Sequence, residues 1–150
     1  MSKLVFDADV AMAEWVRSRI PGATSFGPCR AVGVSSPSGQ KLWAAVVYNE
    51  YHPELGICSL SVASDYPRWV TRQTIRKLLS VPFLQYGCRK VYVTIASDNA
   101  RSLKFAQGLH FRHEATLRHH YGHKRHALVL SMMRSEFDRW WNVVEMKEAA

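Results

Sequence analysis

The segment VYVTIASDNARSLKFAQGLHF, residues 91–111, decides the fold class. Its first six residues are apolar or β-branched, which is typical of a buried strand. Three polar residues follow, and from residue 100 to about residue 109 apolar side chains recur at helical spacing. Phe111 then opens another β-rich run. The segment therefore predicts a strand, a crossover helix and a further strand.

The residues on either side of this segment predict the remaining elements. Strands are expected over residues 3–6, 29–35, 41–48, 56–63, 91–96, 111–118 and 126–133. Helices are expected over residues 7–19, 65–80, 100–109 and 135–148. Asp7 and Asp65 are placed to cap the first two helices, since an aspartate accepts hydrogen bonds from the free N–H groups at a helix start. The turn sequence at residues 36–39, Ser-Pro-Ser-Gly, predicts a hairpin between the second and third strands.

This order of elements, β-α-β-β-β-α-β-α-β-β, predicts an α/β fold in one domain that spans all 150 residues. The hairpins require antiparallel pairing, whereas the two strand–helix–strand crossovers in the second half require parallel neighbours. We therefore expect one mixed sheet covered by helices.

The composition is that of an ordinary soluble domain. Hydrophobic residues make up 47% of the chain, and no run reaches the roughly 18 apolar residues that a membrane-spanning helix needs. Asp7 and Asp9 stand where a signal peptide would be apolar, so we expect a cytoplasmic protein with no membrane partner. Cys29, Cys58 and Cys88 are odd in number and lack metal-type spacing, which favours reduced thiols over disulfides or a zinc site.

Positive charge is concentrated in one part of the chain. The formal net charge is +8, but residues 66–134 alone hold thirteen Lys and Arg against Asp98 and Glu114, a balance of +11 that leaves −3 for the remainder. Six of the seven histidines lie in the same segment, so mild acid would add to its positive charge. An anionic partner is implied, whether a phosphorylated cofactor, a nucleic acid or an acidic protein surface.

The element order and the motif at residues 99–111 together resemble the GNAT superfamily of acyl-CoA-dependent N-acyltransferases over nearly the whole chain. The motif is similar to the Asn-x-x-Ser…Gly-Phe signature of ribosomal-protein-type N-terminal acetyltransferases, although His110 stands where the family usually has the glycine. The resemblance implies acetyl-CoA as the acyl donor, with Asn99 and Ser102 lining its thioester and pantetheine. The alternative for this pair is a helix cap followed by a polar residue of the first turn.

The resemblance also implies a CoA pyrophosphate site at the start of the preceding helix, where free N–H groups and the helix dipole favour anions. The family sequence there is Arg/Gln-x-x-Gly-x-Gly/Ala, and this chain has Arg68-Trp69-Val70-Thr71-Arg72-Gln73, without a glycine. We expect Thr71 and Gln73 to hinder close approach of the backbone to the phosphates. The hydroxyl group of Thr71 and the guanidinium group of Arg72 would compensate through charge-assisted contacts. The alternative for the spacing of Arg68, Arg72 and Arg76 is a solvated helix face.

Acyl transfer to an amine needs the amine in its neutral form, so a carboxylate or imidazole is expected near the acceptor as general base. Glu50 and His52 follow the predicted hairpin, where members of this fold open their acceptor groove, and are the candidates; a polar loop is the alternative. Many family members protonate the departing thiolate with a tyrosine of the last crossover helix, but the matching residue here is Ala106. Ser102 is one substitute by resemblance, and Tyr121 in the final hairpin is another.

The histidines of the final hairpin suggest a metal site at first sight. They are His119, His120, His123 and His126. Successive residues of a strand point to opposite faces, which would separate His119 from His120 and argues against a shared metal ion. We expect no metal and, instead, a basic rim that faces the acceptor.

Three functions follow. The first is an N-acetyltransferase that works by direct attack of an amine on acetyl-CoA, with the N–H groups of Ser61, Val62 and Ala63 holding the pantetheine and the carbonyl. The second is a DNA-modifying enzyme, because residues 43–48, 67–69 and 82–88 are loosely similar to phage-encoded members of this fold, including the Mom type that modifies adenine.

The third function is a non-catalytic module that binds nucleic acid or protein on a degenerate form of the fold. Nucleic acid would bind through residues 66–134, where the charge is concentrated. The acceptor and the oligomeric state, a homodimer included, stay open.

Overall fold

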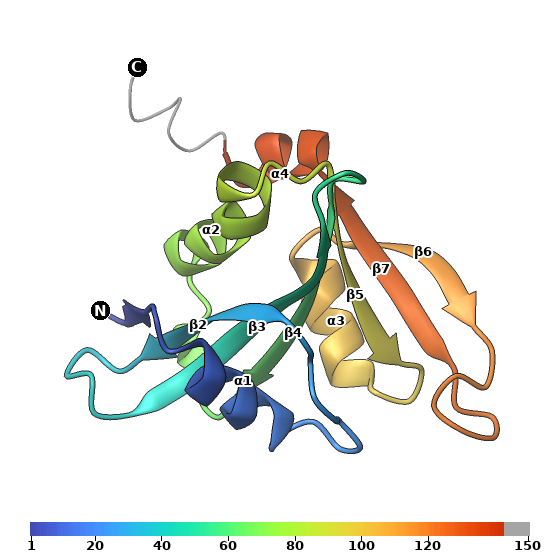
Figure 1. Ribbon diagram of the computed structural model, residues 1–150, viewed down its shortest axis with the longest axis horizontal. Helices are drawn as coiled ribbons and strands as arrows, with labels where there is room; N and C mark the ends of the chain where they lie inside the picture. Colours follow the sequence, from blue (N-terminus) through green and yellow to red (C-terminus); the bar gives the residue numbers. More distant parts are fainter. Residues whose placement is uncertain (143–150) are drawn as a thin grey trace.

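Seven strands form one mixed sheet in the order β1-β2-β3-β4-β5-β7-β6 (Figure 1). The protein is represented by a computed structural model, which describes residues 1–142. The strands are Lys3–Val5 (β1), Cys29–Ser35 (β2), Leu42–His52 (β3), Ile57–Ser64 (β4), Lys90–Ala96 (β5), Arg112–Leu117 (β6) and Ala127–Met133 (β7). The α-helices are Asp9–Arg17 (α1), Arg72–Ser80 (α2), Ala100–Gly108 (α3) and Arg134–Trp140 (α4). A 3₁₀ turn, Pro67–Trp69 (η1), precedes α2, and a π-helical turn, Val81–Gln85 (η2), follows it.

The predicted element order and the mixed sheet are confirmed, with one correction to the pairing. β4 and β5 are parallel neighbours, as the first crossover requires. The strands of the second crossover, β5 and β6, are not neighbours, because β7 inserts between them and pairs antiparallel with both. A strand that lies antiparallel between two parallel strands can form backbone hydrogen bonds with both of them.

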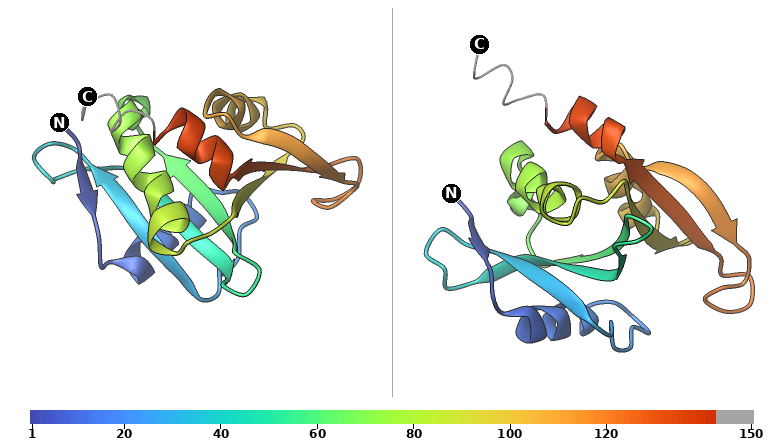
Figure 2. Two further views of the ribbon diagram at one scale, coloured as in Figure 1. Left: turned by 90° about the horizontal axis from the view of Figure 1, so that it is seen from above. Right: turned by 45° about the horizontal axis from the view of Figure 1, so that its top comes forward.

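Helices cover the two faces of the sheet unequally. α1 packs on one face, where Val16 meets Ala45 and Val47 of β3. α2 and α4 lie on the opposite face (Figure 2), over a core that includes Tyr48 and Phe83. The buried hydroxyl group of Tyr48 donates a hydrogen bond to the carbonyl of Leu78 (2.7 Å), which ties β3 to α2.

Both predicted aspartate caps are wrong. Asp7 adopts φ +60° ahead of α1, which begins at Asp9. Asp65 accepts two hydrogen bonds from the guanidinium group of Arg19, both 2.8 Å, and α2 begins only at Arg72. The cap of α2 is Thr71, whose hydroxyl group accepts a hydrogen bond from the N–H of the residue three positions on.

Two further bounds differ from expectation. β3 continues through residues 49–52, which were expected to follow the strand, and the helical backbone after α2 continues through Pro82 as η2. α4 confirms a helix after β7, but residues 143–148 of the predicted helix, Val144 among them, lie outside the described residues.

Two general expectations can be compared with residues 1–142. No helix in this range is long and apolar enough to cross a membrane. The three cysteines are free thiols, with Cys58 and Cys88 buried and Cys29 half-buried.

Candidate functional site

The parallel strands β4 and β5 separate part-way along their length. They pair through residues 57–59 and 90–92. Beyond these residues β4 remains paired with β3 up to Ser64, and β5 with β7 up to Ala96. The two strands therefore diverge, as Figure 1 shows at the centre of the sheet. We call the region between residues 60–64 and 93–96 the wedge.

The backbone of β4 directs hydrogen-bonding groups into the wedge. The N–H of Asp65 donates to the carbonyl of Trp43 (2.8 Å), so the backbone groups of Ala63 and Ser61, two and four residues earlier, also point to β3. Because the N–H groups of successive residues in a strand point in opposite directions, the N–H of Val62 points toward β5. Of the three residues predicted to hold the pantetheine, only Val62 offers its N–H group to the wedge.

Trp69 closes the wedge on the face that carries α2 and α3. Its indole N–H donates to the hydroxyl oxygen of Ser64 at the end of β4 (2.9 Å). Its ring centroid lies 5.9 Å from that of Phe105 on α3. The side chain is only 2% exposed, so Trp69 forms a buried bridge between β4 and α3.

The start of α3 borders the wedge at the end of β5. The side-chain oxygen of Asn99 accepts a hydrogen bond from the N–H of Ser102 (3.2 Å). Asn99 therefore caps α3, which is the structural role that the sequence left open. Ser102 is half-buried and lies in the first turn of α3.

The predicted phosphate-binding residues do not gather at the wedge. Arg68, Thr71 and Gln73 line a groove between α2 and the N-terminal segment, and no residue of β5 or α3 lines that groove. The guanidinium group of Arg72 turns instead to α4, where it donates to the carbonyl of Trp140 and lies 5.1 Å from the ring of Trp141.

Glu50 reaches the closed end of the wedge, whereas His52 does not. Glu50 has φ +49° where the β3–β4 pairing is irregular, and its carboxylate accepts a hydrogen bond from the hydroxyl group of Tyr92 (2.5 Å). Tyr92 is the last residue of β5 that pairs with β4. Burial, followed by the hydrogen bond to Glu50, raises the pKa of Tyr92, so the phenol stays protonated. His52 is exposed at the end of β3, with Nδ1 3.8 Å from a carboxylate oxygen of Glu54.

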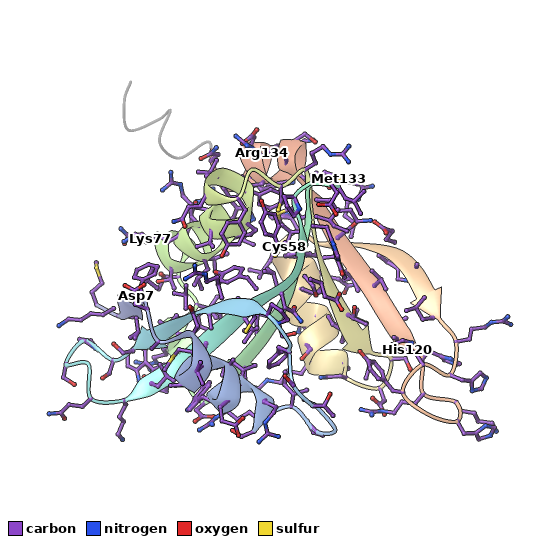
Figure 3. The ribbon with its side chains drawn as sticks, viewed as in Figure 1. Asp7, Cys58, Lys77, His120, Met133 and Arg134 are labelled. Atoms are coloured by element: carbon purple, nitrogen blue, oxygen red, sulfur yellow. The ribbon has the colours of Figure 1, made fainter. Side chains whose placement is uncertain are left out.

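The hairpin that joins β6 and β7 extends away from the body of the sheet, and Figure 3 shows His120 near its tip. Tyr121 contacts residues of the same hairpin: its ring lies 5.1 Å from that of His120 and 5.7 Å from the guanidinium carbon of Arg125. Arg125 forms an ion pair with Asp98 (3.0 Å), which fixes the hairpin to the loop before α3.

Two of the hairpin histidines hold the turn itself. Nδ1 of His119 accepts from the N–H of Lys124 (2.8 Å), and Nδ1 of His126 accepts from the N–H of His119 (2.9 Å). Within residues 1–142, no group of three or more His, Cys, Asp or Glu side chains is arranged to hold a metal ion.

Comparison with solved structures places this geometry among known folds. A structure of mutant forms of the spermidine/spermine N-acetyltransferase SpeG from Vibrio cholerae matches with a TM-score of 0.75 at 13% identity, covering 93% of this chain and 98% of the other. The fold is that of the GNAT acetyltransferases. A proposed acetyltransferase matches with a TM-score of 0.72 at 18% identity, covering 97% and 93%. A chimera of SpeG and hSSAT matches this GNAT fold with a TM-score of 0.73 at 13% identity, covering 91% and 98%. Neither a comparison with protein-family models nor one with curated protein sequences gives a match.

Sequence reasoning missed two residues of the site in this GNAT fold. Trp69 was named only as a member of the segments 68–73 and 67–69, with no role of its own, and its buried bridge depends on a loop conformation that no local signal predicts. Tyr92 belongs to the run VYVTIA, where a single tyrosine is an ordinary strand residue. A signal for Tyr92 was its position as the second residue of the predicted parallel strand.

Proposed function

We propose that the protein transfers an acetyl group from acetyl-CoA to an amine. The observation that carries the proposal is the divergence of β4 and β5 after residues 59 and 92, which leaves the N–H of Val62 directed between two strands. An unpaired amide beside a gap between strands suits an extended, amide-containing chain such as pantetheine, since each backbone polar group needs a partner. The GNAT fold supports the same assignment, and acetyl-CoA is then a substrate that leaves after each turnover.

This chain suits the pantetheine and thioester end of acetyl-CoA better than the pyrophosphate end. Val62 would bind the pantetheine or the carbonyl, and the start of α3 at Asn99 and Ser102 would face the thioester end. The pyrophosphate end lacks the expected support, because Thr71 caps its own helix and Arg72 is bound to α4. We therefore expect weaker binding of CoA phosphates than a glycine-rich loop would provide.

Glu50 is the proposed general base. In the reaction, the amine nitrogen bonds to the thioester carbonyl carbon, the carbon–sulfur bond breaks, and the amine loses one proton. The Glu50 carboxylate would accept that proton directly or through a water molecule, while Tyr92 holds the carboxylate in place. Ser102 would pass a proton to the thiolate and regain one from water, while Glu50 releases its proton to water; Tyr121 is a weaker candidate, because its contacts lie within the hairpin.

The class of amine is open, and one observation favours a nucleic acid. The β6–β7 hairpin exposes Arg118 and Lys124, neither of which forms an ion pair within residues 1–142, and Arg101 and Lys104 of α3 add two more such cations. Cations of this kind bind phosphate backbones without sequence preference. A DNA base is thus a second candidate acceptor, and a module that binds DNA without catalysis is the competing function.

The experiment is an acetyl-transfer assay with acetyl-CoA and a panel of amines: polyamines, a lysine peptide, a peptide with a free α-amino group, and duplex DNA. Mass spectrometry of each acceptor would show a gain of one acetyl group. Native mass spectrometry of the purified protein would show whether CoA or acetyl-CoA co-purifies. If no acceptor gains mass and millimolar acetyl-CoA leaves the melting temperature unchanged, acetyl transfer is excluded and the binding module remains.

A further inference from the structure

The turn that joins β6 and β7 contains two residues with left-handed backbone. His119 has φ +54° and Lys124 has φ +59°. Residues with a side chain rarely adopt this conformation, because Cβ then lies too close to a carbonyl oxygen. Each of the two positions therefore needs an interaction that stabilises it.

The N–H groups of these same two residues donate hydrogen bonds to imidazole rings of the turn. The N–H of Lys124 donates to Nδ1 of His119 (2.8 Å), and the N–H of His119 donates to Nδ1 of His126 (2.9 Å). The backbone hydrogen bonds inside the turn use other N–H groups, which are those of Tyr121, Gly122 and Arg125. The two imidazoles are thus the groups that hold the left-handed residues in place.

Both hydrogen bonds require Nδ1 without a proton. A neutral imidazole offers one nitrogen as an acceptor, whereas an imidazolium ion donates from both nitrogens. A proton on Nδ1 of either ring would place two N–H groups against each other, so the hydrogen bond would break. Histidine is the side chain that ordinarily changes its charge between about pH 5 and 8. The two bonds are therefore expected in neutral solution and lost in mild acid.

Repulsion between the rings would add to this loss. The ring centroid of His119 lies 5.0 Å from that of His126 and 5.6 Å from that of His123, and imidazolium ions at such distances repel each other. The other titratable or charged side chains of the turn and of the loop against which it packs are Arg118, His120, Tyr121, Lys124, Arg125 and Asp98. This set contains one carboxylate, and it is already paired with Arg125 (3.0 Å). Protonation would thus leave the turn with repulsion between cations and no free carboxylate in this set to offset it.

The base of the hairpin depends on other bonds. The N–H of Ser97 donates to the carbonyl of His126 (2.8 Å), and the N–H of His126 donates to Oγ of Ser97 (3.1 Å). Neither bond uses an imidazole nitrogen, and β6 and β7 pair from Leu117 and Ala127 onward. The base is therefore expected to stay in place when the turn changes.

We propose that the β6–β7 turn is a pH-sensitive element, closed while His119 and His126 are neutral and open when both are protonated. Opening would move Lys124, because its N–H loses the acceptor that holds it. A partner that contacts Lys124 would then bind differently in neutral solution and in mild acid. The proposal does not depend on acetyl transfer, because neither ring belongs to the proposed reaction.

The test is a titration of the nitrogen-15-labelled protein from about pH 8 to about pH 5, followed by two-dimensional NMR. The amide protons of His119 and Lys124 are expected to shift upfield as they lose their acceptors. The heteronuclear NOE of residues 119–124 should fall over the same range, while that of residues 127–133 stays constant. Constant order in residues 119–124 across the titration would overturn the proposal.

Replacement by asparagine separates the proposed cause from a general effect of acid. The side-chain oxygen of asparagine accepts a hydrogen bond, as Nδ1 does, but it does not titrate. The double variant His119→Asn with His126→Asn should therefore keep the order of residues 119–124 down to about pH 5. His120→Asn is the matched control, because the ring of His120 lies against Tyr121, and it should open as the wild type does. An equal loss of order in the double variant and the wild type would also overturn the proposal.

Discussion

The hydroxyl group of Tyr92 donates a 2.5 Å hydrogen bond to the carboxylate of Glu50. The two residues lie on β5 and β3, so the bond passes across β4 beside Ser59, the last residue that β4 pairs with β5. It therefore marks the point at which the strands begin to diverge. A carboxylate held at the closed end of a gap between strands is placed to receive a proton from an amine that enters there.

Replacing Glu50 tests this role. Glu50→Gln keeps the shape and the hydrogen bond from Tyr92 but removes the base, so acetyl transfer should fall about 100- to 10,000-fold at saturating acetyl-CoA. Glu54→Gln, in the neighbouring turn, is the control and should retain its rate. A Glu50→Gln enzyme as fast as the wild type would exclude Glu50 as the base.

Asn99 and Ser102, at the start of α3, have different expected roles, one in stability and the other in turnover. Asn99→Ala removes the observed cap and should lower the free energy of unfolding by about 1 kcal/mol. Ser102→Ala leaves that cap in place, so it should cost less stability and yet lower the turnover. Urea unfolding and steady-state kinetics measure the two effects. Full turnover by a folded Ser102→Ala variant would show that Ser102 has no part in the reaction.

Trp69 should report on binding at the wedge. A pantetheine arm beside Val62 would compete with the indole for the end of β4, so the hydrogen bond to Ser64 should break when acetyl-CoA binds. The tryptophan emission of the wild type is expected to change on titration with acetyl-CoA, and the change should be largely absent in Trp69→Phe. The same change in both proteins would place the ligand elsewhere.

The thiols should react in order of their burial. Burial, and then Cys88, raises the pKa of Cys58 to about 12, so its thiol stays protonated and unreactive at pH 8. Burial also raises the pKa of Cys88 and of Cys29, but Cys29 is only half-buried. Iodoacetamide should label Cys29 first in the folded protein and all three thiols in urea, as read by mass spectrometry. Labelling of Cys58 as fast as Cys29 would contradict the packing of the core.

If the β6–β7 hairpin binds DNA through its cations, the affinity should fall as the salt concentration rises. Arg112 and Arg125, which the charge pattern also suggests as contacts, are paired with Glu136 and Asp98, so Arg118 and Lys124 are the residues to change. The slope of log affinity against log salt should become shallower by about 1.8 when both are replaced by Gln.

Lys41→Gln, near the other edge of the sheet, is the control for this measurement and should leave the salt slope unchanged. Absence of detectable binding to duplex and single-stranded DNA at about 50 mM salt, where phosphate contacts are still strong, would remove nucleic acid as the acceptor.

Local pattern predicted the regular elements well and the connections poorly. The bounds of β2 were predicted to the residue, because a run of β-branched and apolar residues between turn signals is sufficient for a buried strand. The Asp65 cap failed because the ion pair with Arg19, 46 residues away in sequence, uses the carboxylate. A rule based on neighbouring residues cannot predict an ion-pair partner that is so distant in sequence.

In the candidate site, too, local sequence predicts some residues, whereas the position of others depends on how distant elements pack. The place of Asn99 and Ser102 at the start of α3 could be predicted, since a short motif at a strand–helix junction is local in sequence, and their role at the thioester stays a prediction. The position of Glu50 was expected in a loop and is instead in an irregular stretch of β3, although the expectation that it lies near the acceptor stays open to test. The bridge from Trp69 to Ser64 and Phe105 could not be predicted, because it depends on how three elements pack together.

Hydrogen exchange measured by mass spectrometry, with and without acetyl-CoA, tests the central claim most directly. Binding at the wedge predicts slower exchange in peptides that cover residues 60–64 and 99–103, because the N–H of Val62 and the first turn of α3 would gain partners. Peptides that cover the β2–β3 turn should not change. Unchanged exchange in 60–64 and 99–103 at millimolar acetyl-CoA would contradict the account, as would protection confined to residues 1–6 and 71–77.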